Sequence, residues 1–272
     1  YMAPDGENFR GVNAVCIFSQ DKKYTLDELI KDGYDTKLSA FEVLLPALIA
    51  NFQKDAQAQE PNLKDLEAPI QVLKNWNYYS NVNSVATTLA NEWAFKLNPI
   101  LQKVYIDEGE KDQVENMSEF AKTAGIDDML PQLREVIQEL QTKFGKWEIP
   151  WGDINRFQRP SGDIDLTYDD NKESLAMGTA SVLWGSLPAF KSSYQNNSKK
   201  RYGYNGNSFI CAVEFGPKIK AKSLLAGGNS GDPNSKHFFD QAKMYQNAQF
   251  KDVLFYKEDV QKNAEKTYHP GE

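Results

Sequence analysis

The sequence predicts an α+β fold in which a helical block is followed by antiparallel strands. Between residues 25 and 145, apolar residues recur at helical spacing between helix start and stop signals. From Trp147 onward, short β-rich runs alternate with turn residues. The 272 residues, 40% hydrophobic and 25% charged, are typical of a globular protein with a sizeable core.

Residues 1–24 are predicted to form a sheet strand segment, because the run RGVNAVCIFS (10–19) has a β-rich centre. Cys16 lies in this run and Cys211 lies in the similar run FICAVEF. Buried free thiols are the expected state of both cysteines, and a disulfide between them is the alternative.

Residues 25–146 are predicted to be mostly helical. Thr25 precedes LDELI with Glu28 three residues on, which is the spacing of a capping box. The run SAFEVLLPALIANFQKDA follows, with Pro46 as a kink or break, and Gly145 ends the last helix as a C-cap. Helical intervals also separate four apolar residues of the stretch between these runs: Trp76, Val85, Leu89 and Trp93.

Residues 147–226 are predicted to be mostly β, with strands in WEIPWGDI, DIDLTYD, AMGTASVLWGSL, SFICAVEF and IKAKSLL. Gly216, Pro217 and Lys218 join the last two runs, which is a hairpin pattern. Residues 227–272 are predicted to be a Gly/Ser loop, GGNSGDPNSKHFFDQ, and a C-terminal tail that opens with a short helix in AKMYQNAQF.

Charge and hydropathy exclude two classes of partner. The net charge of −7 argues against nucleic acid, and the basic cluster SKKRYGY (198–204) is predicted to be a solvated loop among asparagines and glycine. The longest apolar run, FEVLLPALIA, is too short to span a membrane. We expect neither nucleic acid nor a membrane as partner.

Common catalytic motifs are absent from the sequence, which has no G-x-S-x-G, no H-E-x-x-H and no C-x-x-C. Two histidines make a histidine-dependent hydrolase or a multi-histidine metal site improbable. A nucleophile that is activated by an amine needs no histidine, so this chemistry stays open.

The C-terminal hairpin, the Gly/Ser loop, H-x-x-D-Q, K-M-Y and FYKEDVQKNAE together resemble the end of the penicillin acylase family, which are N-terminal-nucleophile amidohydrolases. Four earlier stretches agree in the same order: YMAPDGENFRG, KYTLDELIKDGYD, FEVLLPAL and WGDINRFQR. The resemblance implies part of a four-layer αββα fold, with the remaining strands and helices in a segment upstream of this chain.

The resemblance also implies that residues 1–272 are a C-terminal fragment of the nucleophile-bearing subunit. Family members cut themselves from a precursor, and the new first residue, usually Ser, is the nucleophile. Tyr1 is not suited to that role. The nucleophile and the oxyanion-hole Asn are therefore expected upstream, so that this chain alone is inactive. Its expected partners are that upstream part, the smaller subunit and a small-molecule amide substrate.

The activity implied is hydrolysis of linear amides: penicillin-type amides in antibiotic metabolism, acyl-homoserine lactones or other N-acyl compounds. The resemblance places the protein in the periplasm or outside the cell. No cofactor is expected. A structural calcium ion is possible in the full enzyme, with its ligands largely upstream, so no metal ligand is assigned here.

Arg10 matches an arginine that the family places beside its catalytic centre, where a guanidinium would hold a side chain or a substrate carboxylate. The alternative is a structural ion pair that anchors the first strand. Asn13 is a weaker candidate of the same kind.

The C-terminal loop offers four further candidates: Ser230, His237, Asp240 and Gln241. Asp240 could orient the imidazole as part of a dyad or a metal site, but a structural role in locking the loop is favoured.

Trp151, Phe157 and Trp184 are candidates for an apolar acyl pocket, with core packing as the alternative. Arg156 and Arg159 could pair with Asp153 or with carboxylates across the sheet.

A rival hypothesis is a non-catalytic carbohydrate- or ligand-binding module, suggested by the loop SYQNNSKKRYGYNGNS and the 12% aromatic residues. Such a module should fold with its own closed sheet and an exposed aromatic platform. An acylase fragment should instead expose apolar sheet surface or an unpaired strand edge.

Overall fold

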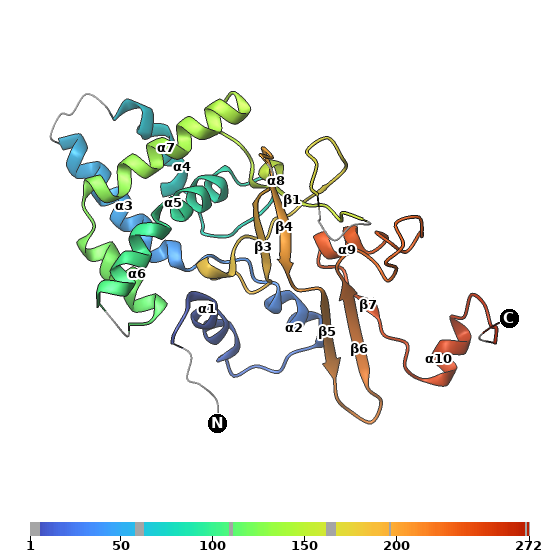
Figure 1. Cartoon of the computed structure of the whole chain (residues 1–272). Helices are drawn as coiled ribbons and strands as arrows, with labels where there is room; N and C mark the ends of the chain where they lie inside the picture. Colours follow the sequence, from blue (N-terminus) through green and yellow to red (C-terminus); the bar gives the residue numbers. More distant parts are fainter. Residues whose placement is uncertain are drawn as a thin grey trace.

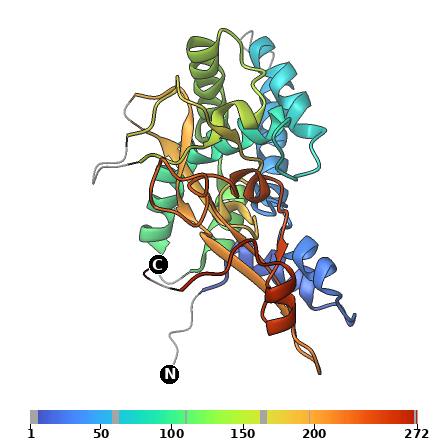
Figure 2. The ribbon, with the colours of Figure 1, turned by 90° about the vertical axis from the view of Figure 1, so that its right-hand side faces the viewer.

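The computed structural model describes residues 6–57, 63–108, 111–161, 167–195, 197–269 and 271. It confirms the α+β class, and most described residues between 26 and 144 are helical (Figure 1). The helices of residues 40–144 lie to one side of two small sheets, and the C-terminal segment with its two short helices lies on the other side. In the view turned by 90°, the hairpin of residues 209–225 extends to the lower right, away from the helices of residues 40–144 (Figure 2).

The main helices and short helical turns follow one another along the chain as α1 Phe9–Phe18, α2 Leu26–Gly33, α3 Ala40–Gln57, α4 Lys64–Lys74, α5 Val85–Glu108, α6 Gln113–Thr123, α7 Ile126–Phe144, α8 Trp151–Ile154, η1 Val182–Trp184, α9 Ala242–Gln246 and α10 Lys257–Lys262. The strands are β1 Asn155–Phe157, β2 Leu175–Ala176, β3 Phe190–Tyr194, β4 Arg201–Gly206, β5 Phe209–Glu214, β6 Lys220–Leu225 and β7 Lys251–Asp252.

Two sheets are formed by these strands. The first has the order β2-β1-β4-β3, in which β1 pairs with β4 in parallel and the other pairs are antiparallel. The second has the order β5-β6-β7 and is antiparallel throughout. The predicted hairpin of residues 209–225 is confirmed, with Phe209 opposite Leu225 and Glu214 opposite Lys220. The expectation of antiparallel strands alone is wrong for the β1–β4 pair.

The main core fills the helical block, where α3, α5 and α7 pack together around Phe41, Leu89 and Trp93. The indole of Trp93 is fully buried and donates to the Met129 carbonyl at 3.0 Å, so its one polar atom is satisfied. A second, smaller core lies where the sheets meet α9 and includes Phe190 and Tyr245. The sheets are thereby fixed to the helical block on one side and to the C-terminal segment on the other.

Local signals in the helical block act as the sequence predicts. Thr25 and Glu28 form both halves of the capping box at the start of α2. Gly145 ends α7 with a φ of 80°, a conformation that glycine adopts without steric cost.

Two other predictions in the helical block differ from the structure. α3 continues through Pro46, so the predicted break is absent. The stretch around Trp76 is not one helix, because α4 ends at Lys74 and α5 begins at Val85.

The prediction of a strand in residues 1–24 is wrong, since residues 9–18 form α1. Asn8 caps this helix by accepting a hydrogen bond from the Gly11 amide. Phe9 and Asn13, four residues apart, are the buried residues of the helix. Tertiary docking of this face overrides the β preference of the valine and isoleucine residues.

Several predictions in residues 147–226 are also corrected. WEIPWGDI forms α8 instead of a strand, and AMGTASVLWGSL contributes only the end of β2 and η1. Strand β4 occupies residues 201–206, where a solvated loop was expected. Residues 163–166 of DIDLTYD lie outside the described residues.

Cys16 and Cys211 are both free and exposed, which contradicts the expected burial and the disulfide alternative. The predicted short helix in AKMYQNAQF is confirmed as α9.

Candidate functional site

Arg10 and Asn13 attach α1 to the turn that precedes β3. The Arg10 guanidinium donates through Nε and Nη2 to the Leu187 carbonyl, at 2.9 and 2.6 Å. Asn13 Nδ2 donates to Asp35 Oδ1 at 3.0 Å and to the Gly185 carbonyl at 3.2 Å. The Arg10 partner is a carbonyl group, not the carboxylate that a structural ion pair requires. The two predicted residues therefore lie together, with Arg10 exposed and Asn13 buried.

The turn that receives α1 depends on Gly185. Its φ is +123°, and a Cβ at this position would lie 2.6 Å from Ser39 Oγ and 2.7 Å from the Ser39 amide nitrogen. Only glycine combines this conformation with so close an approach. Leu187 is fixed as well, because its amide donates to the Asp35 carbonyl at 3.0 Å. The position of the Arg10 guanidinium is thus set by a rigid backbone segment.

The C-terminal loop brings its four predicted residues together by hydrogen bonds. His237 Nδ1 lies 2.8 Å from Asp240 Oδ2, and the Ser230 amide donates to the His237 carbonyl at 3.0 Å. Gln241 Nε2 donates to Asn229 Oδ1 at 3.1 Å. The His237 and Asp240 side chains are 53% and 39% exposed, so the pair stands at the surface. This geometry favours the structural role.

Arg156 and Arg159 bind the backbone, not the carboxylates that we considered. Arg156 donates to Ser174 Oγ and to the carbonyl groups of Gly152 and Ser174. Arg159 Nη1 donates to the carbonyl groups of Gly228 and Phe238, and its guanidinium lies over the Phe238 ring. Burial lowers the pKa of Arg156, although Asp153 acts in the opposite direction. These arginines attach the end of β1 to its neighbours.

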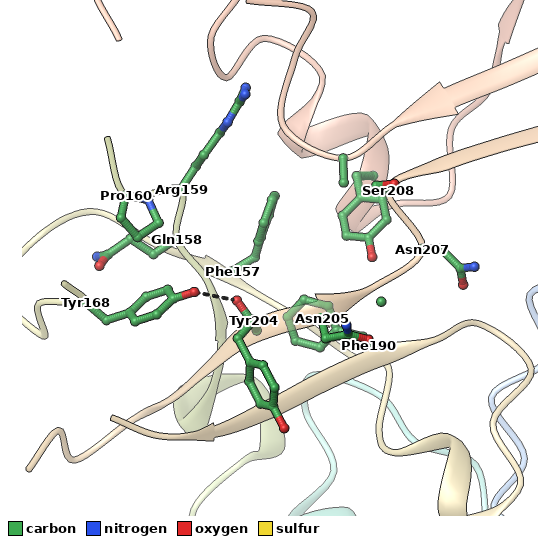
Figure 3. A pocket seen from close by; sticks show the side chains of 14 residues that line it. Phe157, Gln158, Arg159, Pro160, Tyr168, Phe190, Tyr204, Asn205, Asn207 and Ser208 are labelled. Atoms are coloured by element: carbon green, nitrogen blue, oxygen red, sulfur yellow. Dashed lines mark hydrogen bonds between the residues drawn. The ribbon is translucent and has the colours of Figure 1, made fainter. Parts of the chain in front are cut away.

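An aromatic cavity of about 300 Å³ lies beside the second core, between β1, β4 and α9 (Figure 3). Phe157, Tyr168 and Phe190 line it, and Tyr204 lies at its open side. The Tyr168 hydroxyl donates to the Gly203 carbonyl at 3.1 Å, shown as the dashed line in Figure 3. The guanidinium of Arg159 points away from these rings. The cavity walls are therefore mainly apolar, and they would accept an apolar or aromatic group.

Gly203 makes room for the Phe190 ring in the cavity wall. A Cβ on this residue would lie 2.2 Å from the Phe190 ring, so the ring occupies the space that a side chain would take. Burial raises the pKa of Tyr245, which also lines the cavity, to about 12. It also raises the pKa of Tyr168. The hydroxyls of Tyr168 and Tyr245 are therefore neutral at ordinary pH.

The three aromatic residues that the sequence offered for an acyl pocket do not meet in one place. Phe157 lines the aromatic cavity. Trp151 and Trp184 belong to the main core, where each is 1% exposed. Core packing is thus the main role of the two tryptophans.

No group of three or more His, Cys, Asp or Glu side chains that would hold a metal occurs among the described residues. This part of the chain therefore offers no such ligand cluster for the calcium ion that the resemblance allows. No described helix is long and apolar enough to cross a bilayer.

Comparison with known protein families decides where the chain belongs. A family model described as "Penicillin amidase" matches residues 5–262, nearly the whole sequence. The chain belongs to the penicillin amidase family.

A solved structure titled "Thermostable Penicillin G acylase from Alcaligenes faecalis in orthorhombic form" is also similar to this penicillin amidase family member, with 15% sequence identity and a TM-score of 0.49. The match covers 96% of this chain and 52% of the solved chain, so the chain spans about half the length of that structure.

One buried polar cluster of this penicillin amidase family member was not predicted from the sequence. Arg201 on β4 is 6% exposed, and its Nη1 lies 3.1 Å from Glu92 Oε1 on α5. The Tyr194 hydroxyl donates to Glu92 Oε2 at 3.2 Å. Burial and the adjacent Glu92 carboxylate raise the pKa of Tyr194. The only signal in the sequence was the arginine at the start of RYGY, which we assigned to a solvated loop.

Proposed function

We propose that this chain is the C-terminal part of an acylase that hydrolyses linear amides, with an N-terminal nucleophile upstream of Tyr1. The observation that carries the proposal is the family match over residues 5–262. The substrates proposed are penicillin-type amides, acyl-homoserine lactones and other N-acyl compounds. The proposed compartment is the periplasm or the cell exterior, after autoproteolytic processing. The chain alone is proposed to be inactive.

In the proposed reaction, the hydroxyl of the upstream first residue attacks the amide carbonyl while its own α-amine takes up the proton. The amine then passes that proton to the leaving nitrogen, which departs as the free amine and leaves an acyl ester. Water attacks the ester and releases the acid, returning the hydroxyl to the enzyme. An upstream asparagine and a backbone amide would stabilise the oxyanion.

Arg10 is the residue of this chain that we place beside that centre. Its guanidinium is held by two hydrogen bonds to Leu187, and the side chain is exposed. A guanidinium has five N–H donors, so it presents further donors to a neighbouring group. Asn13 supports it by attaching the same helix to Asp35 and Gly185.

One face of the second sheet exposes apolar side chains, which supports the proposal that a further part of the protein covers it. Side chains alternate between the two faces of a strand, so Ile210 and Leu224 enter the second core. The opposite side carries Phe209, Cys211 and Val213, and the exposed Phe215 follows directly after β5; we call these four residues the bare β5 face. Phe209 is 61% exposed and Phe215 is 84% exposed. Such apolar exposure next to a strand edge is typical of an interaction surface.

We therefore propose that the upstream part of the same precursor covers the bare β5 face and supplies the remaining layers of the αββα fold. β5 is the edge strand of its sheet within the described part of the chain. A free-standing binding module should have a closed sheet, whereas both sheets of the described residues are open, so the observation favours the acylase hypothesis.

The test uses the protein expressed from its full gene. We expect intact mass and N-terminal sequencing to show a precursor that is cut to expose Ser, Thr or Cys, and phenylacetyl or fatty-acyl amides to be hydrolysed. The 272-residue chain should lack this activity. An uncut and inactive product would overturn the proposal and favour a binding module.

A second arm of the test addresses the partner. Phe209→Lys combined with Phe215→Lys should reduce copurification of this part with the upstream part after processing. Val260→Lys is the control, because Val260 is also apolar and 46% exposed but lies on α10. Equal association of both variants would contradict the proposed docking face while leaving the activity assay unaffected.

A further inference from the structure

Asp35 lies in the segment that follows α2, and parts of the chain that are distant in sequence meet at it. Its Oδ1 accepts from Asn13 Nδ2 of α1 at 3.0 Å. The same oxygen accepts from the Lys37 amide at 2.8 Å. The Asp35 carbonyl accepts from the Leu187 amide at 3.0 Å, in the segment that precedes β3. Asp35 therefore joins α1, the end of α2 and the segment that carries Leu187.

Leu187 connects Asp35 with Arg10. Its amide donates to the Asp35 carbonyl, and its own carbonyl accepts from Arg10 Nε and Nη2 at 2.9 and 2.6 Å. Leu187 itself is buried, with 7% of its surface exposed. A movement of this segment away from Asp35 would therefore also move the carbonyl group to which Arg10 is bound.

A second connection runs through α1 itself. Asn13 lies three residues after Arg10, so that the two side chains leave the helix on neighbouring positions of one face. Ser39, four residues after Asp35, donates through Oγ to the carbonyl of Phe9 at 3.2 Å. The segment after α2 thus holds the helix at the residue before Arg10 and at the residue one turn later. Asp35 contributes to this attachment and to that of Leu187.

The Asp35 carboxylate supplies an acceptor at a fixed place. Both donors that bind it, the Asn13 side-chain amide and the Lys37 backbone amide, are neutral groups. Both bonds end on the same oxygen, Oδ1. The amide oxygen of an asparagine can accept the same two bonds, whereas alanine offers no acceptor. The two replacements therefore separate loss of the acceptor from loss of the charge.

We propose that Asp35 is a positioning residue for the amide hydrolysis proposed above, because it fixes α1 and the Leu187 carbonyl and thereby holds the Arg10 guanidinium in one orientation. The inference rests on the proposed function for the role that it gives to Arg10. Asp35 acts through Arg10 and not on the reacting atoms. A displacement of about 1 Å in a positioned group can cost about a hundred-fold in rate, so the attachment has a measurable effect.

The first test measures hydrolysis of a phenylacetyl amide by the full-length, processed protein. Asp35→Ala should lower kcat by about ten- to a hundred-fold, whereas Asp35→Asn should stay within about three-fold of the native value, since the acceptor is kept. Thermal melts identify the variants that are folded. Equal losses for the alanine and the asparagine variants would overturn the proposal.

Asp170→Ala is the matched control. Asp170 is also half-buried, and its carboxylate accepts from the Tyr202 hydroxyl at 2.9 Å and from the Lys199 amide at 2.7 Å. It therefore loses one side-chain bond and one backbone bond, as Asp35→Ala does, but in contact with β4 and not with α1. We expect kcat to stay close to the native value. A loss as large as that of Asp35→Ala would contradict a specific role of Asp35.

The second test asks whether Asp35 acts through Arg10. In an Arg10→Lys background, Asp35→Ala should cost almost no further activity, because the group that it positions has already been replaced. A residue with a merely structural role would cause the same additional loss in both backgrounds. Equal additional losses would overturn the proposal.

The third test needs no activity. In full-length protein labelled with 15N-arginine, the Nε–H signal of Arg10, identified by its absence from Arg10→Lys, should exchange slowly with water because Leu187 accepts from it. We expect this signal to be lost in Asp35→Ala and kept in Asp35→Asn and Asp170→Ala. A folded Asp35→Ala that retains the slow signal would overturn the proposal. If the native protein hydrolyses no amide, the proposed function fails, and this signal alone still decides whether Asp35 positions Arg10.

Discussion

Glu92 on α5 and Arg201 on β4 form a 3.1 Å ion pair although 109 residues separate them in the sequence. Both side chains are less than a tenth exposed. Tyr194 donates to the same carboxylate, and the Arg201 guanidinium lies between the rings of Phe95 and Tyr194. This pair is the main polar contact that joins the helical block to the first sheet.

Replacement of Glu92 by Gln should destabilise the protein by about 3–5 kcal/mol, because the buried guanidinium then lacks a counter-charge. Urea unfolding followed by circular dichroism measures the change. The control is Asp259→Asn, which removes an exposed partner of Lys218 and should cost less than about 1 kcal/mol. Similar losses for the two variants would show that the buried pair has no special role.

Replacement of Gly228 by Ala should disrupt the C-terminal loop. The added Cβ would lie 2.2 Å from the His237 carbonyl oxygen and 2.8 Å from Asp240 Oδ1, and at least the former belongs to rigid backbone. We expect a loss of about 1–3 kcal/mol. Gly231→Ala in the same loop is the matched control, because nothing lies within 4 Å of its Cβ position and no change is expected. Limited proteolysis of the loop reports the same difference.

Tyr245→Phe should improve stability only at alkaline pH. Burial raises the pKa of Tyr245 from 10.0 to about 12, so the folded state retains the hydroxyl proton that the unfolded state loses. The contribution of this group is full below pH 10 and is lost as the pH rises through 12. The free energy of unfolding at pH 8 should therefore match the native value, whereas at pH 11.5 the variant should be more stable. Tyr268→Phe, at a residue that is 66% exposed, is the control for the loss of a tyrosine hydroxyl.

Phe215→Lys should reduce self-association of the isolated 272-residue chain. Phe215 is 84% exposed on the bare β5 face, so its replacement removes apolar surface without removing a core contact. Sedimentation velocity at increasing concentration measures the effect. Unfolding in urea should be unchanged within about 0.5 kcal/mol. A native chain that stays monomeric at high concentration would contradict the prediction.

Features with a local cause were predictable from the sequence. The capping box at Thr25, the C-cap at Gly145 and the β5–β6 hairpin each depend on residues a few positions apart. The contact between His237 and Asp240 is of the same kind, since three residues separate them. The family resemblance was also visible, because it rested on the order of short patches along the chain.

Features with a distant cause were not predictable. α1 has β-rich residues, and its helical state depends on Asn13 binding Asp35 and Gly185. β4 begins with a basic residue, and only the encounter of Arg201 with Glu92 explains its burial.

The parallel pairing of β1 with β4 has a consequence for the order in which the protein is made. β1 leaves the ribosome before β3 and β4 exist, and by then the whole helical block has been synthesised. The helices can collapse early, but the sheet cannot close until β4 returns to lie beside β1. A chain that stalls or is truncated before residue 201 would therefore display a finished helical half beside an open β1 edge, which is a target for chaperones and proteases.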